Sequence, residues 1–297
     1  MHQETLLYMW HRLPLHDKRP PREYRPCVHG PLPTTEWCEV QPGPATLGVN
    51  RDEMPFGWDN EFPSCIVHVP TFEIESQNVT NAAFREFVEA GGYRSSRWWR
   101  PDDWSWIQAG RVEHPLFWER LGDDWRWRGM FESIPLPAAW PVYVSHAEAS
   151  AYAAWRGARL LTEAEFCRAA YATPDGPDRA YPWGAAAPDQ THGTFDFASW
   201  DPTPAGAHPA GRSAWGIEDL VGNGWEWTSS VFAPFPGFKP MASYPEYSAD
   251  FFDGEHFVIK GASPATSREL IRPTFRNWFR PRYPYVYATF RLARSAS

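Results

Sequence analysis

The amino-acid sequence predicts an α+β fold made of short helices and short strands joined by irregular backbone. The 297 residues include 31 prolines and 21 glycines, which interrupt nearly every apolar run. Eighteen tryptophans and an aromatic content of 16% supply bulk for a core that regular elements alone would not fill. Residues 216–228, GIEDLVGNGWEWT, join a glycine turn to tryptophans that alternate with the period of a strand.

The charge and hydropathy of the chain exclude several classes of partner. A net charge of -8 with a pI near 5.7 disfavours binding to nucleic acid or to an anionic membrane, because both reward a basic surface. No run reaches the roughly 18 apolar residues that a membrane span needs, and the start lacks the layout of a signal peptide. We therefore expect a cytoplasmic protein.

The chain divides into a helix, a linker and one large domain. Residues 2–12 predict a helix, because Leu6, Met9 and Leu13 recur at spacings of three and four before Pro14 ends it. Residues 15–37 are rich in proline, arginine and histidine, which favours an extended linker. Residues 38–297 show no second boundary and form the predicted α+β domain.

The first half of this domain carries recognisable strand and helix patterns. Residues 65–69 and 72–74 alternate as strands, and residues 80–88 predict a helix capped by Thr80. Residues 98–127 contain seven tryptophans among charged residues without clear periodicity, which indicates an insertion over the surface that could roof a cleft.

Two further helices follow a predicted strand at residues 141–144. Ser145 with Glu148, and Thr162 with Glu165, have the spacing of capping boxes, in which each side chain bonds the other residue's backbone N–H. We expect helices to begin at both positions.

The turn at residues 216–228 brings together groups that suit a hard cation. Asp219 and Glu226 supply carboxylates, and Gly222 and Gly224 free the backbone to expose carbonyl oxygens, so the four residues could bind calcium. The alternative is a turn braced by hydrogen bonds without a metal.

This turn, read as Gly-x-x-Asp-x-x-Gly-Asn-x-Trp-Glu-Trp, resembles the formylglycine-generating-enzyme (sulfatase-modifying factor) superfamily. The resemblance implies an irregular α+β domain related to the C-type lectins. It does not extend to the superfamily's cysteine chemistry. The four cysteines, Cys27, Cys38, Cys65 and Cys167, all precede the region 263–291 in which that family carries its working cysteines. We therefore do not expect formylglycine generation.

The start of the chain resembles a second, narrower group. Its Met-His-x-Glu-Thr-Leu-Leu-Tyr-Met sequence is similar to the second half of the His-x-x-x-His-x-Glu helix of EgtB-type sulfoxide synthases, the oxygen-dependent enzymes of ergothioneine biosynthesis. The resemblance implies that His2 and Glu4 belong to an Fe(II) motif whose other histidines would lie before Met1. Residues 1–14 would then be the remnant helix of an iron-binding helical bundle. Without the resemblance, His2 alone indicates a solvated residue.

Two tyrosines in the second half of the domain match the same group. Tyr244 and Tyr247 fall on a Tyr-x-x-Tyr-Ser segment that lines the iron pocket of these synthases. The resemblance implies that Tyr244 donates a proton during the reaction and that Tyr247 is its neighbour, a role that suits a phenol. Without the resemblance, their spacing beside prolines favours packing alone.

An Arg-Asn-Trp segment near the end of the chain completes the resemblance. It implies that Asn277 and Trp278 contact the betaine substrate, where an indole face can hold a quaternary ammonium; a core cluster is the alternative. Mycobacterial-type enzymes continue with an aspartate and, four residues on, an arginine, which grip γ-glutamylcysteine. This chain departs from that pattern. It has Phe279 and Tyr283 there, with Arg280 and Arg282 as shifted carboxylate-binding groups consistent with free cysteine or another donor.

The resemblance thus implies an iron-dependent oxidoreductase. It would use Fe(II) and O2 to join a thiol donor to hercynine, the betaine of histidine, as a sulfoxide synthase. Two alternatives remain open: a selenoneine synthase that takes a seleno-sugar, and a non-catalytic, lectin-like module that binds calcium.

Overall fold

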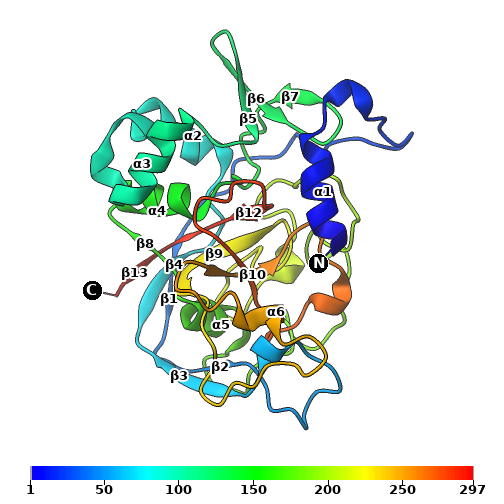
Figure 1. Ribbon diagram of the computed structural model, residues 1–297, viewed down its shortest axis with the longest axis vertical. Coiled ribbons are helices and arrows are strands. Elements are labelled where there is room, and N and C mark those ends of the chain that lie inside the picture. The colour runs from blue at the N-terminus through cyan, green and yellow to red at the C-terminus, as the bar shows by residue number, and fades with distance from the viewer. Residues whose placement is uncertain (1, 297) are drawn as a thin grey trace.

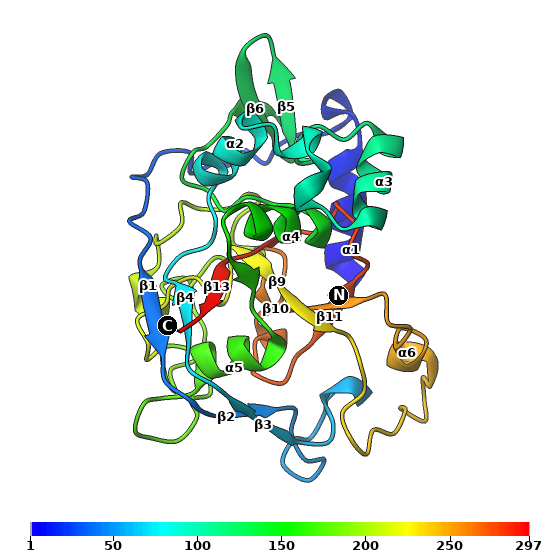
Figure 2. The ribbon, with the colours of Figure 1, turned by 90° about the vertical axis from the view of Figure 1, so that its left-hand side faces the viewer.

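The computed structural model describes residues 2–296 and confirms the α+β class with short elements. The helices are α1 (His2–Arg12), α2 (Asn81–Glu89), α3 (Pro101–Gly110), α4 (His146–Trp155), α5 (Glu163–Tyr171) and the single turn α6 (Glu246–Ala249). Figure 1 shows α1 along one side of the molecule, across from the C-terminal end of the chain. Helices α2, α3 and α4 gather near one end, where the hairpin of β5 (Trp118–Leu121) and β6 (Asp124–Arg128) projects, as Figure 2 also shows.

Two four-stranded sheets form the centre of the fold. The first has the order β1 (Trp37–Val40), β4 (Phe72–Glu75), β13 (Leu292–Ser295), β8 (Arg159–Leu160). The second has the order β11 (Asn277–Phe279), β10 (Phe257–Ala262), β9 (Gly224–Val231), β12 (Ala288–Thr289). Strand β11 lies at the edge of this sheet.

Two smaller sheets flank this centre. Strands β2 (Gly43–Leu47) and β3 (Cys65–Val69) pair antiparallel, and β5 (Trp118–Leu121), β6 (Asp124–Arg128) and β7 (Ser133–Pro135) form a meander. The predicted strands at residues 65–69 and 72–74 are confirmed as β3 and β4. Trp225 and Trp227 lie on one strand, β9, and both are fully buried, as their alternation predicts.

The predicted helix caps are confirmed. The backbone N–H of Ala83 donates to Thr80 Oγ1 at the start of α2. Both capping boxes are present, at Ser145 for α4 and at Thr162 for α5. These local signals located the helix starts because a cap needs only residues that are neighbours in sequence.

The predicted strand at residues 141–144 is wrong. Val142 donates its backbone N–H to Val79 O at 2.9 Å, and Val144 donates to Ala288 O at 3.0 Å. Each end of the segment therefore meets a different partner, so no ladder forms and only an isolated bridge joins Pro141 to Thr80. The apolar sequence of this segment could not show that its backbone would form hydrogen bonds with two different segments.

The segment 98–127 contributes tryptophans to the core, which its polarity did not predict. It forms α3 and the strands of the hairpin, and Trp118 and Trp127 face each other across β5 and β6 among the fully buried side chains. Phe117 stacks on Trp127 with ring centroids 5.4 Å apart. Charged residues of the hairpin point outward while these aromatic rings point inward, so the average polarity was misleading.

Helix α1 forms as predicted but turns the opposite face inward. Leu6 and Met9 are 62% and 66% exposed, whereas Glu4, Tyr8 and His11 are buried. These three residues are spaced four and three apart and therefore share one side of the helix. Polar partners in the domain, described below, select this face over the apolar one.

The predicted linker packs against the domain. Trp140 Nε1 donates to the carbonyl of Cys27 at 2.8 Å, and Tyr24 donates its hydroxyl hydrogen to Asp201 at 2.7 Å.

Among residues 2–296, no helix is both long enough and apolar enough to cross a membrane.

Candidate functional site

A cavity of about 400 Å³ lies between the start of α1, the α6 region and the edge strand β11. Its lining consists of His2, Thr5, Tyr244, Tyr247, Phe251, His256, Asn277, Trp278, Phe279, Arg280 and Tyr283. The structure thus brings together, from distant parts of the chain, eight residues that the sequence proposed for one site: His2, Tyr244, Tyr247, Asn277, Trp278, Phe279, Arg280 and Tyr283.

Aromatic rings build most of this pocket. Trp278 stacks on Phe232 with centroids 4.1 Å apart and planes only 6° apart, so one face of its indole is covered. Tyr247 meets the indole edge-on at 5.6 Å, and Phe251 lies at 5.5 Å. The indole of Trp278 thus lines the pocket inside an aromatic surround, which suits a quaternary ammonium group.

Asn277 holds a buried donor without a partner. The side chain is only 5% exposed, and its Oδ1 accepts the backbone N–H of Trp278 at 2.9 Å. Within the described chain, no acceptor meets its Nδ2. Because an unpaired buried donor is costly, the amide points to an acceptor that arrives with a ligand.

Trp58 and Asp59 hold the segment that carries Tyr244 and Tyr247 in place. Trp58 stacks on Tyr247 at 4.2 Å, and Asp59 accepts hydrogen bonds from the Ser248 hydroxyl and from the Met241 backbone N–H. Burial, followed by the nearby carboxylates of Glu61 and Asp59, raises the pKa of Tyr247 above its usual value, so this phenol stays protonated.

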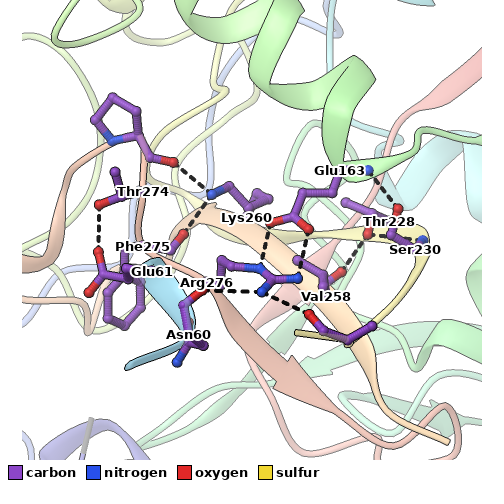
Figure 3. A network of polar contacts seen from close by, with 12 residues as sticks. Asn60, Glu61, Glu163, Thr228, Ser230, Val258, Lys260, Thr274, Phe275 and Arg276 are labelled. Atoms are coloured by element: carbon purple, nitrogen blue, oxygen red, sulfur yellow. Dashed lines mark hydrogen bonds and ion pairs between the residues drawn. The ribbon is translucent and has the colours of Figure 1, made fainter. Parts of the chain in front are cut away.

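Strand β11 is fixed by a buried ionic network, shown in Figure 3. The guanidinium of Arg276, next to Asn277 in sequence, binds both oxygens of Glu163 at 2.8 and 3.0 Å. It also donates to the carbonyl of Asn60 at 3.2 Å. Lys260 donates to two carbonyls of the loop that leads to Arg276. These contacts fix the backbone from which Asn277 and Trp278 project.

Glu4 lies in the core and does not line the pocket with His2. Its Oε1 accepts from the Tyr8 hydroxyl at 2.6 Å, from Trp225 Nε1 at 2.7 Å and from the Ser263 hydroxyl. Residues two apart lie on nearly opposite sides of a helix, so His2 and Glu4 cannot both face the pocket. Glu4 here attaches α1 to the domain.

The residues described do not make a complete iron site. Three histidines, or two with a carboxylate, are the usual protein ligands of a nonheme iron that keeps open positions. His2 and His256 line the pocket, but no cluster of three His, Cys, Asp or Glu side chains suited to a metal occurs in residues 2–296. An iron ion at His2 would need ligands from beyond these residues.

The proposed calcium turn is buried and largely satisfied by protein groups. Both oxygens of Glu226 bind Arg291, at 2.6 and 2.8 Å. Asp219 accepts the backbone N–H of Gly206, while its other oxygen has no partner within the described chain, and burial raises its pKa to about 6. At Gly222 (φ 94°), a Cβ would meet the Thr194 backbone at 2.8 Å, so the glycine is required for packing.

Gly224, the fourth residue of the proposed calcium turn, begins β9, and a Cβ there would meet Thr289 and Tyr143 at 3.0 Å. This glycine therefore serves close packing as well. Calcium binding at the turn stays a prediction.

The two shifted arginines differ in position. Arg282 lies outside the pocket, where its Nε is 2.9 Å from Asp103 Oδ1. Arg280 lines the pocket and pairs with Glu255 at 2.9 Å and Asp253 at 3.5 Å. Only Arg280 is placed to meet a ligand.

Sequence reasoning missed three lining residues, Thr5, Phe251 and His256. Thr5 is one helical turn from His2, so the helix period could have found it. His256 follows Asp253 by three residues, a spacing at which the two side chains can meet in a tight turn. Nothing in the sequence marked that turn as part of a pocket.

Comparisons with known proteins agree with this architecture. Residues 29–296 match the family described as "Sulfatase-modifying factor enzyme 1-like domain". Among solved structures, the protein PvdO from Pseudomonas aeruginosa superposes with a TM-score of 0.56 at 21% identity, covering 88% of this chain and 94% of that one. This similarity concerns the fold alone.

Two curated relatives carry functional names. The protein named "Hercynine oxygenase" from Mycobacterium tuberculosis is 44% identical over 250 residues, covering 83% of this chain and 58% of that protein. "Ergothioneine biosynthesis protein 1" from Neurospora crassa is 26% identical, covering 99% of this chain and 42% of that protein. The chain thus spans about half the length of these relatives. It belongs to the sulfatase-modifying factor enzyme 1-like family.

Proposed function

We propose that this chain provides the substrate-binding part of an Fe(II)- and O2-dependent enzyme that forms a C–S bond on hercynine in ergothioneine biosynthesis. The names and identities of the relatives support the pathway. The chemistry of the pocket supports the substrate, since hercynine combines a quaternary ammonium, a carboxylate and an imidazole.

The unpartnered Nδ2 of Asn277, beside Trp278, is the observation that carries this proposal. Phe232 covers one face of the indole, so the trimethylammonium group would lie against the other face and be held there by cation–π attraction. Asn277 Nδ2 would donate to an acceptor of the same ligand and so satisfy its buried hydrogen. The two groups would fix the betaine in one orientation.

His2 is the one residue of this chain that we propose as an iron ligand. Bound iron would supply oxygen activation, and His2 is the residue of this chain that would coordinate it from the pocket. The described residues do not complete such a site, so we derive no reaction step through it.

Tyr244 is the proposed proton donor. It lies in the pocket wall next to Tyr247, with ring centroids 5.7 Å apart, and its side chain is 52% exposed. A neutral phenol can donate a proton or a hydrogen bond to a reacting group that reaches it.

Substitution of Trp278 tests the substrate. Calorimetric titration of the chain with hercynine should give a dissociation constant that rises about tenfold in Trp278→Leu, since a desolvated cation–π contact contributes on the order of 1–2 kcal/mol. Histidine, which lacks the methyl groups, should bind more weakly than hercynine to the wild type and lose little in the variant.

The matched control is Trp183→Leu, which removes an indole that stacks on Tyr181 and His192 outside the pocket. Its affinity for hercynine should equal that of the wild type. Equal affinities for hercynine in Trp278→Leu and the wild type would refute the assignment of the betaine to this pocket.

A further inference from the structure

Trp278 is the first of three stacked groups that lead from the pocket into the core. Its indole lies 4.1 Å from the ring of Phe232, and the two planes are 6° from parallel. The guanidinium of Arg276 lies over the same Phe232 ring, 4.9 Å from its centroid. Because the indole covers one face of Phe232, the guanidinium occupies the opposite face. A positive charge therefore stands behind the indole to which we assign an ammonium group.

Burial lets this charge act over the length of the stack. The Arg276 side chain is only 3% exposed, and its guanidinium also lies 4.2 Å from the ring centroid of Phe235. Solvent and salt therefore screen it weakly. Three stacking distances make roughly 13 Å, over which two unit charges at an effective dielectric constant of about 20 change a binding constant up to about tenfold.

Glu163 balances the charge of Arg276. Its two carboxylate oxygens accept hydrogen bonds from the guanidinium at 2.8 and 3.0 Å, and its side chain is 6% exposed. Figure 3 shows Lys260, another buried cation, near this pair. Lys260 donates to the carbonyls of Pro273 and Phe275, which carry no net charge. Glu163 is therefore the carboxylate that this group of side chains depends on.

A helix start holds Glu163 in place. It is the first residue of α5, directly after the cap Thr162, and its backbone N–H donates to Ser230 Oγ at 2.9 Å. The N-terminus of a helix stabilises a negative charge. The carboxylate is thus fixed by local structure before it meets Arg276.

We propose that Glu163 sets the charge preference of the pocket. By neutralising Arg276 behind the stack of Phe232 and Trp278, it lets the indole accept a quaternary ammonium group. Glu163 touches no ligand and acts through Arg276, so it is a positioning residue. The inference rests on the proposed function, because it takes Trp278 as the ammonium site. An ion pair that only braced β11 would affect charged and neutral ligands alike.

Two probes of equal shape measure the charge preference. In 3,3-dimethylbutan-1-ol a carbon replaces the quaternary nitrogen of choline. Each probe is titrated calorimetrically into the full chain at pH 8.5, which favours ionised carboxylates, and the ratio of the two dissociation constants gives the preference. Wild type should prefer choline about tenfold, because the alcohol lacks the cation–π attraction.

The two single variants should move this ratio in opposite directions. Glu163→Gln leaves the guanidinium uncompensated and should lower the preference for choline about fivefold, with the affinity for the alcohol unchanged. Arg276→Met leaves the carboxylate alone and should raise the preference. Glu163→Leu combined with Arg276→Met removes both charges and should keep the wild-type ratio, since apolar groups often replace a buried ion pair without loss of stability. If one single variant fails to fold, the direction of the change in the other decides.

Glu165→Gln is the matched control. Glu165 lies on the same helix and binds Arg159 with both oxygens, at 2.6 and 2.7 Å, and neither residue lines the pocket. Its ratio should equal that of the wild type.

Equal weakening of both probes in Glu163→Gln would overturn the inference, as would shifts of the ratio in the same direction in both single variants. The wild-type ratio separates this inference from the proposed function. A wild type without preference for choline refutes the ammonium site, and the inference with it. A wild-type preference that neither single variant alters refutes the role of Glu163 alone.

Discussion

Tyr244 and Tyr247 are three residues apart but lie in different surroundings. Tyr247 is stacked on Trp58 and half-enclosed, which holds its phenol protonated. Tyr244 stands at the exposed rim, where its hydroxyl can meet both ligand and solvent. Packing is therefore a sufficient reason for a tyrosine at position 247. The exposed Tyr244 makes few packing contacts, so packing does not account for a tyrosine there.

Removal of the Tyr244 hydroxyl should affect coupling and leave binding intact. In a preparation that couples hercynine to cysteine, Tyr244→Phe should lower kcat on the order of 10²-fold, the usual contribution of a positioned proton donor, with KM nearly unchanged. Product analysis by mass spectrometry measures the rate. Tyr285→Phe, a partly exposed tyrosine outside the pocket lining, is the control. An unchanged kcat would remove Tyr244 from the mechanism.

At the scale of elements, α1 and β11 meet at the pocket and are fixed by different means. Strand β11 is joined to its sheet and braced by Arg276, whereas α1 depends on side-chain hydrogen bonds to Glu4 and His11. His11 lies between the Tyr287 hydroxyl and the carbonyl of Arg128, at 2.9 and 2.8 Å. The position of His2 follows from these contacts.

Glu4→Ala should loosen α1. It would leave the Trp225 indole N–H and the hydroxyls of Tyr8 and Ser263 without their shared acceptor, at a cost of about 2–4 kcal/mol in the free energy of unfolding. Urea denaturation measures this loss. Gln3→Ala, an exposed neighbour on the same helix, should change the free energy by less than about 0.5 kcal/mol. A stable Glu4→Ala would show that α1 is held by other contacts.

At the scale of the whole molecule, buried histidines make the free energy of unfolding depend on pH. Burial lowers the pKa of His11 and of His146 to about 3. A histidine that is neutral when folded and titrates near 6.5 when unfolded stabilises the fold fully above pH 6.5, and this contribution is lost as pH falls toward 3. Asp201 and Asp219, with pKa values raised to about 6, act in the opposite direction.

A difference measurement isolates His11 from these opposing groups. The free energy of unfolding of the wild type minus that of His11→Gln should shrink by about 2 kcal/mol between pH 7.5 and pH 5, since each pKa unit corresponds to about 1.4 kcal/mol. Urea denaturation at both pH values measures it. A difference that stays constant would mean that His11 is not held neutral.

The sequence located features whose causes are local or periodic. Helix caps at Thr80, Ser145 and Thr162 depend on residues within a few positions. The tyrosines and the Asn277–Trp278 pair were predicted for one site by resemblance, and the fold does place them around one cavity. Tertiary partners decided the remainder.

His256 and the buried face of α1 are two features that sequence patterns did not predict, because both depend on tertiary contacts. The role of His256 depends on a turn that presents Asp253 to it, and α1 buries Glu4 because Trp225 and Ser263, more than 220 residues away, supply its donors. The hydrophobic pattern of the helix contains no information about such distant donors, so it predicts that the face with Leu6 and Met9 is buried.

The wide sequence separation of the α1 contacts bears on biosynthesis. A ribosome adds about 5–20 residues per second, and helix α1 packs against groups as far along the chain as Tyr287. Helix α1 is therefore made many seconds before its binding surface exists. During that interval Glu4 and His11 are hydrated, and docking of this helix completes the pocket only when nearly all of the domain has been synthesised.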